Sequence, residues 1–167
     1  LVASYSSNKY RSVQEVQKLQ HKIYKALMYE FEDDLPKWSA KIDVDATVSF
    51  TGYNLVQFQQ GKDEIEKKFK LIIDDFFPRY VSVIKRYDSS IRRIRIEGHT
   101  SSEWGKNDNE DDRYLKNLQL SQGRAFNVLR HSLDTLWKYE KKWIKQKLRS
   151  EGMSSSVLVT DQFGNED

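Results

Sequence analysis

The chain has 167 residues, 38% of them hydrophobic and 32% charged, which is enough for one domain with a real core and a polar surface. Its formal charge of +3 comes from 28 basic and 25 acidic residues, a balance that does not favour nucleic acid or an anionic membrane as partner. The sequence lacks cysteine, which excludes disulfides and thiolate chemistry, and no apolar run approaches the roughly 20 residues that span a bilayer.

The chain begins with a short apolar stub, Leu1–Ala3, followed by several serines. Because it starts with leucine and shows no signal peptide, we expect a fragment or a processed product. Position alone favours a frayed terminus. The alternative is that the stub is the last turn of a transmembrane helix that precedes this chain.

Residues 8–38 are helical in type. Apolar residues recur there at steps of three and four, with Lys, Gln and Glu between them: Val13, Val16, Leu19, Ile23, Leu27, Phe31 and Leu35. The stripe is narrow, as in a coiled-coil seam. Two interpretations are open, a helix packed on its own domain and a helix paired with a second copy as a dimeric stalk.

A strand and an apolar helix follow. Asp45–Phe50 is typical of a strand, whereas residues 53–58 fit either an edge strand or a packed loop. The helix after Gly61 has a wide apolar face suited to packing on a sheet, formed by Ile65, Phe69, Ile72, Ile73, Phe76 and Phe77. Pro78 is expected to break or kink this helix, and the helical pattern then resumes to about Tyr87.

The segment Ile91–Gly98 alternates apolar and charged residues and predicts a strand with one buried face. Ile94 and Ile96 face one side, and Arg93, Arg95 and Glu97 face the other. A polar loop over residues 101–113 includes an acidic run at 107–112. Calcium prefers oxygen ligands such as the carboxylates and carboxamides of this run. However, the run lacks the spacing of a calcium-binding loop, so we favour a solvated loop.

A last helix is predicted from about Leu118 and ends at Gly152, before a short strand at 156–160. Its expected buried residues are Leu120, Phe126, Leu129, Leu133, Leu136 and Trp137. Basic residues alternate with aromatic ones at 139–149, a pattern that occurs in nucleic-acid contacts but also in a helix with solvated lysines, which we favour. The alternation of strands and helices predicts a small α/β sandwich with helices on one face of the sheet.

Two motifs in this order carry a resemblance to a known family. The first is formed by Ile94, Ile96, Glu97, Gly98, His99 and Thr100, and the second by Asn117, Leu120, Ser121, Arg124 and Ala125. Over about residues 45–160 the chain resembles OmpA-like peptidoglycan-binding domains, apart from an enlarged loop between the motifs. The resemblance implies a βαβαβ sheet with helices on one face, preceded by a long N-terminal helix. It divides the chain into a helical stalk at 1–42 and a binding domain at 43–167.

The resemblance places a peptidoglycan site at Thr100, Ser101, Asn117, Leu120 and Arg124. Diaminopimelate in the cell wall carries a carboxylate and an ammonium. Arg124 would grip the carboxylate, helped by a helix N-terminus, while Asn117 would contact the peptide backbone and Leu120 would shape the pocket floor. The family motif reads G-H-T-D, and its aspartate, which pairs with the ammonium, is replaced by Ser101. The candidate substitutes are Glu103, Asp108 and Asp112.

The resemblance further implies the B subunit of an ion-driven stator, from a flagellar motor or from the Zorya anti-phage system. The first residues of the chain, Leu1–Ser7, resemble the Zorya type somewhat more. Such a chain is the periplasmic domain of an inner-membrane protein, a homodimer, and a partner of an A-type stator subunit through a preceding transmembrane segment. His99 is structural in the family. Ser101 lies in a loop without a nucleophile elbow or an oxyanion-hole motif, so we expect no enzyme. The three histidines lack the spacing of metal ligands, so we expect no metal or other cofactor. The alternative is a structural or dimerisation module that has lost peptidoglycan binding. Nucleic-acid binding is not expected.

Overall fold

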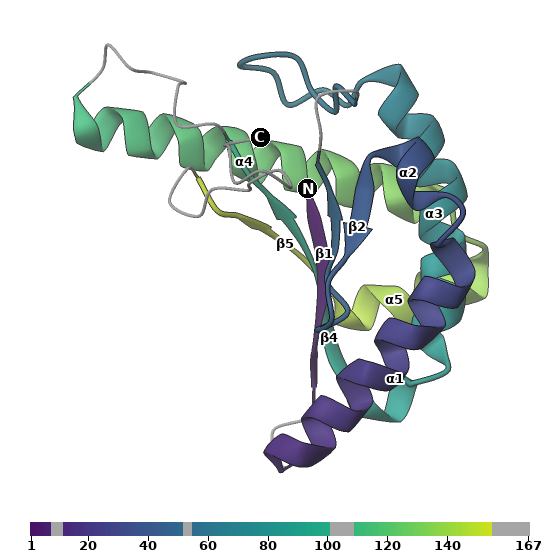
Figure 1. The fold of residues 1–167 in the computed structure, drawn as a ribbon. Helices are drawn as coiled ribbons and strands as arrows, with labels where there is room; N and C mark the ends of the chain where they lie inside the picture. The colour runs from purple at the N-terminus through teal and green to yellow at the C-terminus, as the bar shows by residue number, and fades with distance from the viewer. Residues whose placement is uncertain (8–11, 52–54, 101–108, 155–167) are drawn as a thin grey trace.

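The computed structural model describes residues 1–7, 12–51, 55–100 and 109–154 (Figure 1). It contains one five-stranded sheet with the strand order β2-β3-β1-β4-β5, and α1, α2 and α3 lie on one side of it. The predicted α/β architecture is confirmed. The elements are β1 (Val2–Ser7), α1 (Val13–Phe31), α2 (Leu35–Trp38), β2 (Ala40–Ile42), β3 (Val48–Phe50), α3 (Lys67–Lys85), a 3-10 turn (Asp88–Ser90), β4 (Ile91–Gly98), α4 (Glu110–Asp134), α5 (Lys138–Lys147) and β5 (Leu148–Gly152).

The N-terminal residues form the central strand of the sheet. β1 is antiparallel to both neighbours, so that Val2 lies opposite Ser49 of β3 and Glu97 of β4. Ala3 is only 4% exposed. The expectation of a frayed terminus, or of the last turn of a transmembrane helix, is therefore wrong for residues 2–7. Pairing with two strands distant in the sequence decides this conformation, because strand propensity depends strongly on such neighbours.

The helix α1 packs on its own domain. Its N-terminus is fixed by a capping box, in which the Ser12 hydroxyl accepts from the Glu15 backbone N–H and the Glu15 carboxylate accepts from the Ser12 N–H. Its predicted stripe is buried from Leu19 to Phe31 in the same core as α3 and the sheet. The expected division into a stalk at 1–42 and a domain at 43–167 stays a prediction, although residues on both sides of position 42 share one sheet and one core.

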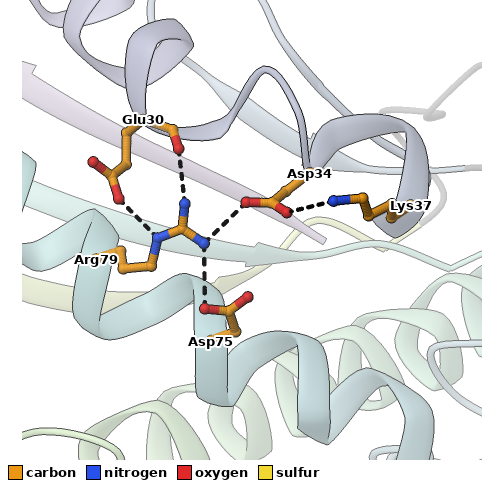
Figure 2. A network of polar contacts seen from close by, with 5 residues as sticks. All are labelled: Glu30, Asp34, Lys37, Asp75 and Arg79. Carbon is orange, nitrogen blue, oxygen red and sulfur yellow. Dashed lines mark hydrogen bonds and ion pairs between the residues drawn. The ribbon is translucent and has the colours of Figure 1, made fainter.

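Arg79 of α3 holds the C-terminal end of α1 (Figure 2). Its Nε lies 2.7 Å from Glu30 Oε1, and its Nη1 lies 3.0 Å from Asp34 Oδ2 and 3.2 Å from Asp75 Oδ1. Its Nη2 donates to the Glu30 carbonyl at 2.7 Å, so the arginine satisfies a backbone acceptor near the end of α1. The guanidinium also lies 4.8 Å from the centre of the Phe31 ring. α3 itself continues through Pro78 instead of breaking there.

The strand β4 has the predicted two faces. Ile94 and Ile96 are buried under the helices, whereas Arg93 is exposed and Arg95 is partly exposed on the other face. A solvated second face is common in sheets with antiparallel strands.

The elements after β4 differ from the prediction, which was one helix from Leu118 to Gly152; the structure has two helices, since α4 ends at Asp134 and α5 begins at Lys138. α4 begins at Glu110 instead of Leu118, with Asn109 as its N-cap, so part of the acidic run forms a first helical turn that complements the helix dipole. α5 ends at Lys147, and Leu148–Gly152 continues as β5, parallel to β4. Before β4, the short strand β2 was not predicted either. The strand predicted at 156–160 lies outside the described residues.

The buried face of α4 is also different from the predicted one. It is formed by small and polar residues: Asn117, Ser121, Ala125, Val128 and Ser132. Phe126 and Trp137, which were expected in the core, are 54% and 82% exposed. Leu136 is buried and Leu129 and Leu133 pack against the core, as expected. Where its small residues face the sheet, the helix lies very close to it. None of the helices in the described part of the chain is long and apolar enough to cross a membrane.

Candidate functional site

The two motifs meet where β4 ends and α4 crosses it. A Cβ on Gly98 would lie 2.2 Å from the Ser121 carbonyl oxygen, and a Cβ on Gly152 would lie 2.5 Å from the Gln122 nitrogen. Glycine is required at both positions because the helix backbone occupies the space of a side chain. The Ser121 hydroxyl donates to the Leu118 carbonyl at 2.9 Å and accepts from the Ser154 N–H at 3.0 Å. Gly98 and Ser121 thus bring α4 against the ends of β4 and β5.

Arg124 of α4 lies at this end of the sheet. Its Nε donates to the Lys62 carbonyl at 3.0 Å, its Nη1 to the His99 carbonyl at 3.2 Å and its Nη2 to the Gln59 carbonyl at 3.3 Å. The guanidinium lies over the Phe58 ring, 4.9 Å from its centre. The three carbonyls fix the arginine between the end of β4 and the turn that precedes α3.

That turn is set by Gly61, whose φ of 69° lies in the left-handed region that glycine adopts without strain. The Lys62 N–H donates to the Gln59 carbonyl at 3.0 Å and closes the turn. As a result, the carbonyls of Gln59 and Lys62 both reach Arg124. The sequence indicated a glycine before a helix but gave no sign that this turn holds Arg124.

The charge of Arg124 is not paired with a carboxylate among the described residues, in contrast to the charge of Arg79, which meets three. Burial lowers the pKa of Arg124, and the nearby charge of Asp63 acts in the opposite direction. A guanidinium has five N–H donors, so two are left after the three bonds to carbonyls. This arrangement can bind an anion such as a carboxylate with little rearrangement.

The expected help from a helix N-terminus is absent. α4 begins at Glu110, 14 residues before Arg124. At 1.5 Å per residue this distance is about 21 Å, well beyond the first turn in which the dipole acts. Any anion bound at Arg124 is held by the guanidinium itself.

The other predicted site residues differ in their burial and in how near they lie to the contacts of Arg124. Thr100 is 5% exposed, and its N–H donates to the Ser154 carbonyl at 3.3 Å, next to the His99 carbonyl that Arg124 contacts. Leu120 is partly buried one turn before Arg124 on α4. Asn117 is fully buried, and its Nδ2 donates to the Arg113 carbonyl at 3.0 Å. Ser101 lies outside the described residues.

His99 and Glu97 lie on the same side of β4, as the alternation predicts. His99 Nε2 is 3.8 Å from Glu97 Oε2, and Arg95 Nε is 3.7 Å from Glu97 Oε1. The nearby His99 ring and the charge of Arg95 lower the pKa of Glu97 despite its partial burial. The contacts tie the histidine to the strand. Within the described ranges, no group of three His, Asp or Glu side chains is placed to hold a metal ion.

Comparisons with known proteins find similarity in sequence and in fold. No protein-family model matches the chain. The Zorya protein ZorB of Escherichia coli is 42% identical over 150 residues, which cover 89% of this chain and 63% of that protein, so the chain spans less than two thirds of the length of this relative. The crystal structure of a MotB-like protein from Desulfovibrio vulgaris shares the fold with a TM-score of 0.56, at 18% identity, over 88% of this chain and 82% of that one. The chain is thus similar to the Zorya protein ZorB over most of its length and shares the fold of a MotB-like protein, in agreement with the resemblance carried by its two motifs.

Proposed function

We propose that the chain is a non-catalytic anchor that binds diaminopimelate-containing peptidoglycan, as the periplasmic domain of an inner-membrane stator protein used in anti-phage defence. The defence role is favoured over the flagellar one because the relative at 42% identity is named a Zorya protein. The longer protein would form a homodimer and would associate with an A-type stator subunit through a transmembrane segment.

The observation that carries the peptidoglycan proposal is the state of Arg124. Its guanidinium is partly buried, oriented by three carbonyls and stacked on Phe58, yet no carboxylate in the described part of the chain neutralises it. A partly buried cation without a counter-ion is stabilised when an anion binds. The carboxylate of a diaminopimelate side chain fits the two N–H groups that are left.

The test is co-sedimentation of the purified chain with diaminopimelate-type sacculi. Wild type is expected to pellet with the sacculi, and Arg124→Ala is expected to stay in the supernatant. Arg124→Lys keeps the charge but loses the planar fork, so it should pellet weakly. The matched control is Arg130→Ala, because Arg130 is an exposed arginine on the same helix and should not affect pelleting.

Thermal denaturation of each variant shows whether it is folded. If wild type and the Arg130→Ala control are folded but neither pellets, the anchor proposal is wrong, and the chain is better described as a structural or dimerisation module. Equal pelleting of wild type and Arg124→Ala would show that peptidoglycan binds somewhere other than at Arg124.

A further inference from the structure

We infer that Asp63 supplies the anionic half of the zwitterion site beside Arg124, and so replaces the family aspartate whose position is taken by Ser101. This inference rests on the proposed function. A ligand end that carries both a carboxylate and an ammonium requires a cation and an anion close together. Arg124 is the cation, and the structure identifies a nearby carboxylate on a different element from the one that the family uses.

Of the three candidate substitutes, Glu103 and Asp108 lie outside the described residues, and Asp112 does not fill this role. Its carboxylate Oδ2 lies 2.6 Å from Asn109 Nδ2, and its backbone N–H donates to Asn109 Oδ1 at 2.9 Å, as part of the N-cap of α4. It precedes Arg124 by 12 positions on the same helix, a distance of about 18 Å along the axis. A side chain bound at that end of the helix cannot share one ligand end with Arg124.

Asp63 is brought to Arg124 by the same turn that orients the guanidinium. The Lys62 carbonyl accepts from Arg124 Nε at 3.0 Å, and the Asp63 carbonyl accepts from Asn127 Nδ2 at 2.8 Å. These two adjacent bonds fasten the turn along α4. They fix the backbone of Asp63 next to the helix turn that carries Arg124.

The Asp63 carboxylate lies on the surface of α4 at Gly123. A Cβ at Gly123 would be 2.6 Å from Asp63 Oδ2 and 3.3 Å from its Cγ, so the missing side chain of the glycine makes room for the acid. Gly123 directly precedes Arg124 in the helix. The negative charge of Asp63 also acts on the guanidinium, although it forms no ion pair with it in the described structure.

Both charged side chains can still form hydrogen bonds or ion pairs with a ligand. Arg124 has two N–H donors beyond its three carbonyl contacts, and Asp63 is exposed with its carboxylate outside any ion pair among the described residues. A pair that is close but not in direct contact can accept a ligand carboxylate on one side and a ligand ammonium on the other. A directly paired arginine and aspartate would have to separate first.

The test varies the charge on the protein and on the ligand. Sacculi are used as purified and after N-acetylation, which removes the ammonium of diaminopimelate. For wild type, acetylation should weaken binding about tenfold, the effect of losing one charge-assisted hydrogen bond. Asp63→Asn should bind untreated sacculi about tenfold more weakly than wild type, and acetylation should then change its binding by less than about twofold.

Two further variants separate this role from a structural one. Gly123→Ala displaces the carboxylate while it raises helix propensity, so it should weaken binding without lowering the melting temperature. Glu64→Gln removes the adjacent exposed acid and should bind like wild type.

The outcomes distinguish this inference from the proposed function. If wild type does not bind sacculi, the proposed function itself is wrong. If wild type binds but Asp63→Asn binds equally well, or if acetylation weakens both proteins to the same extent, the role of Asp63 is refuted and the anchor proposal stands.

Discussion

Replacing Arg79 by alanine should destabilise the domain substantially. The substitution removes the hydrogen bonds to Glu30, Asp34 and Asp75 and leaves the three carboxylates near one another without a cation. Bonds to charged groups contribute about 1.5–3 kcal/mol each when shielded from water. Here the carboxylate side chains are 29%, 21% and 54% exposed, so solvent reduces each contribution. Adding the lost contact with Phe31, we expect the free energy of unfolding to fall by about 2–3 kcal/mol.

Urea denaturation of wild type, Arg79→Ala and Arg79→Lys measures this loss. The lysine variant keeps a charge but cannot bond to three acids and a carbonyl at once, so it should fall between the other two. Arg86→Ala is the control, because Arg86 is an exposed arginine just after the same helix. A loss below about 0.5 kcal/mol for Arg79→Ala, which is the usual range for surface substitutions, would refute the reasoning.

The same network predicts a dependence on pH. Burial acts to raise the pKa of Asp34, but hydrogen bonds from Arg79 and Lys37 outweigh it and lower the pKa. A carboxyl group with a lowered folded-state pKa stabilises the fold above its unfolded pKa of about 3.9, and this stabilisation is lost as pH falls through the folded-state value. Wild type should therefore lose stability below about pH 4, and Arg79→Ala should lose less over the same range. Parallel curves for the two proteins would contradict this assignment.

Two further substitutions test the packing. Gly98→Ala should lower the free energy of unfolding by about 3 kcal/mol or more, because the new Cβ meets the Ser121 carbonyl at 2.2 Å and the helix backbone cannot move aside cheaply; an unchanged melting temperature would show that α4 can shift. Ile23→Ala should cost about 2–4 kcal/mol because the side chain is 0% exposed, whereas Val13→Ala, at 73% exposure, should cost less than about 0.5 kcal/mol. Equal effects of these two would mean that α1 does not pack on its own domain.

Regular hydrophobic patterns made much of the fold predictable. The alternation of β4 gave the correct faces for Ile94, Ile96 and the charged residues between them. The stripe from Leu19 to Phe31 and the wide apolar face of α3 also correspond to buried helix faces. In each case several large side chains repeat with one period, so the sequence carries the signal by itself.

The strands β1 and β5 could not be predicted in this way. Registers place Ala3 and Tyr5 on the core side of β1, opposite Ile96 and Ile94, so this face has one small and one half-buried aromatic side chain. In β5, the core side is carried mainly by Leu148. Such short faces give no clear period, and pairing with distant strands decides the structure.

Part of the buried face of α4 was predicted wrongly for a related reason. The helix lies so close to Gly98 and Gly152 that only small residues fit between helix and sheet. Periodicity that counts large apolar residues then selects the exposed side, where Phe126 lies. The start of α4 carried a usable signal, an asparagine N-cap followed by three acids, but its first turns project beyond the sheet and bury little (Figure 1).

The two arginines show how the same side chain can stabilise a fold or form a binding site. Both are partly buried and both lie over an aromatic ring, Arg79 at 4.8 Å from Phe31 and Arg124 at 4.9 Å from Phe58. Arg79 is surrounded by carboxylates that neutralise it, whereas Arg124 is held by carbonyl dipoles that fix its orientation and leave its charge available. A cation oriented in advance loses little conformational freedom when an anion binds, which favours affinity. Loss of Arg79 should therefore lower stability more than sacculus binding, and loss of Arg124 should lower binding more than stability. If both substitutions changed the two properties in the same proportion, this division of roles would be wrong.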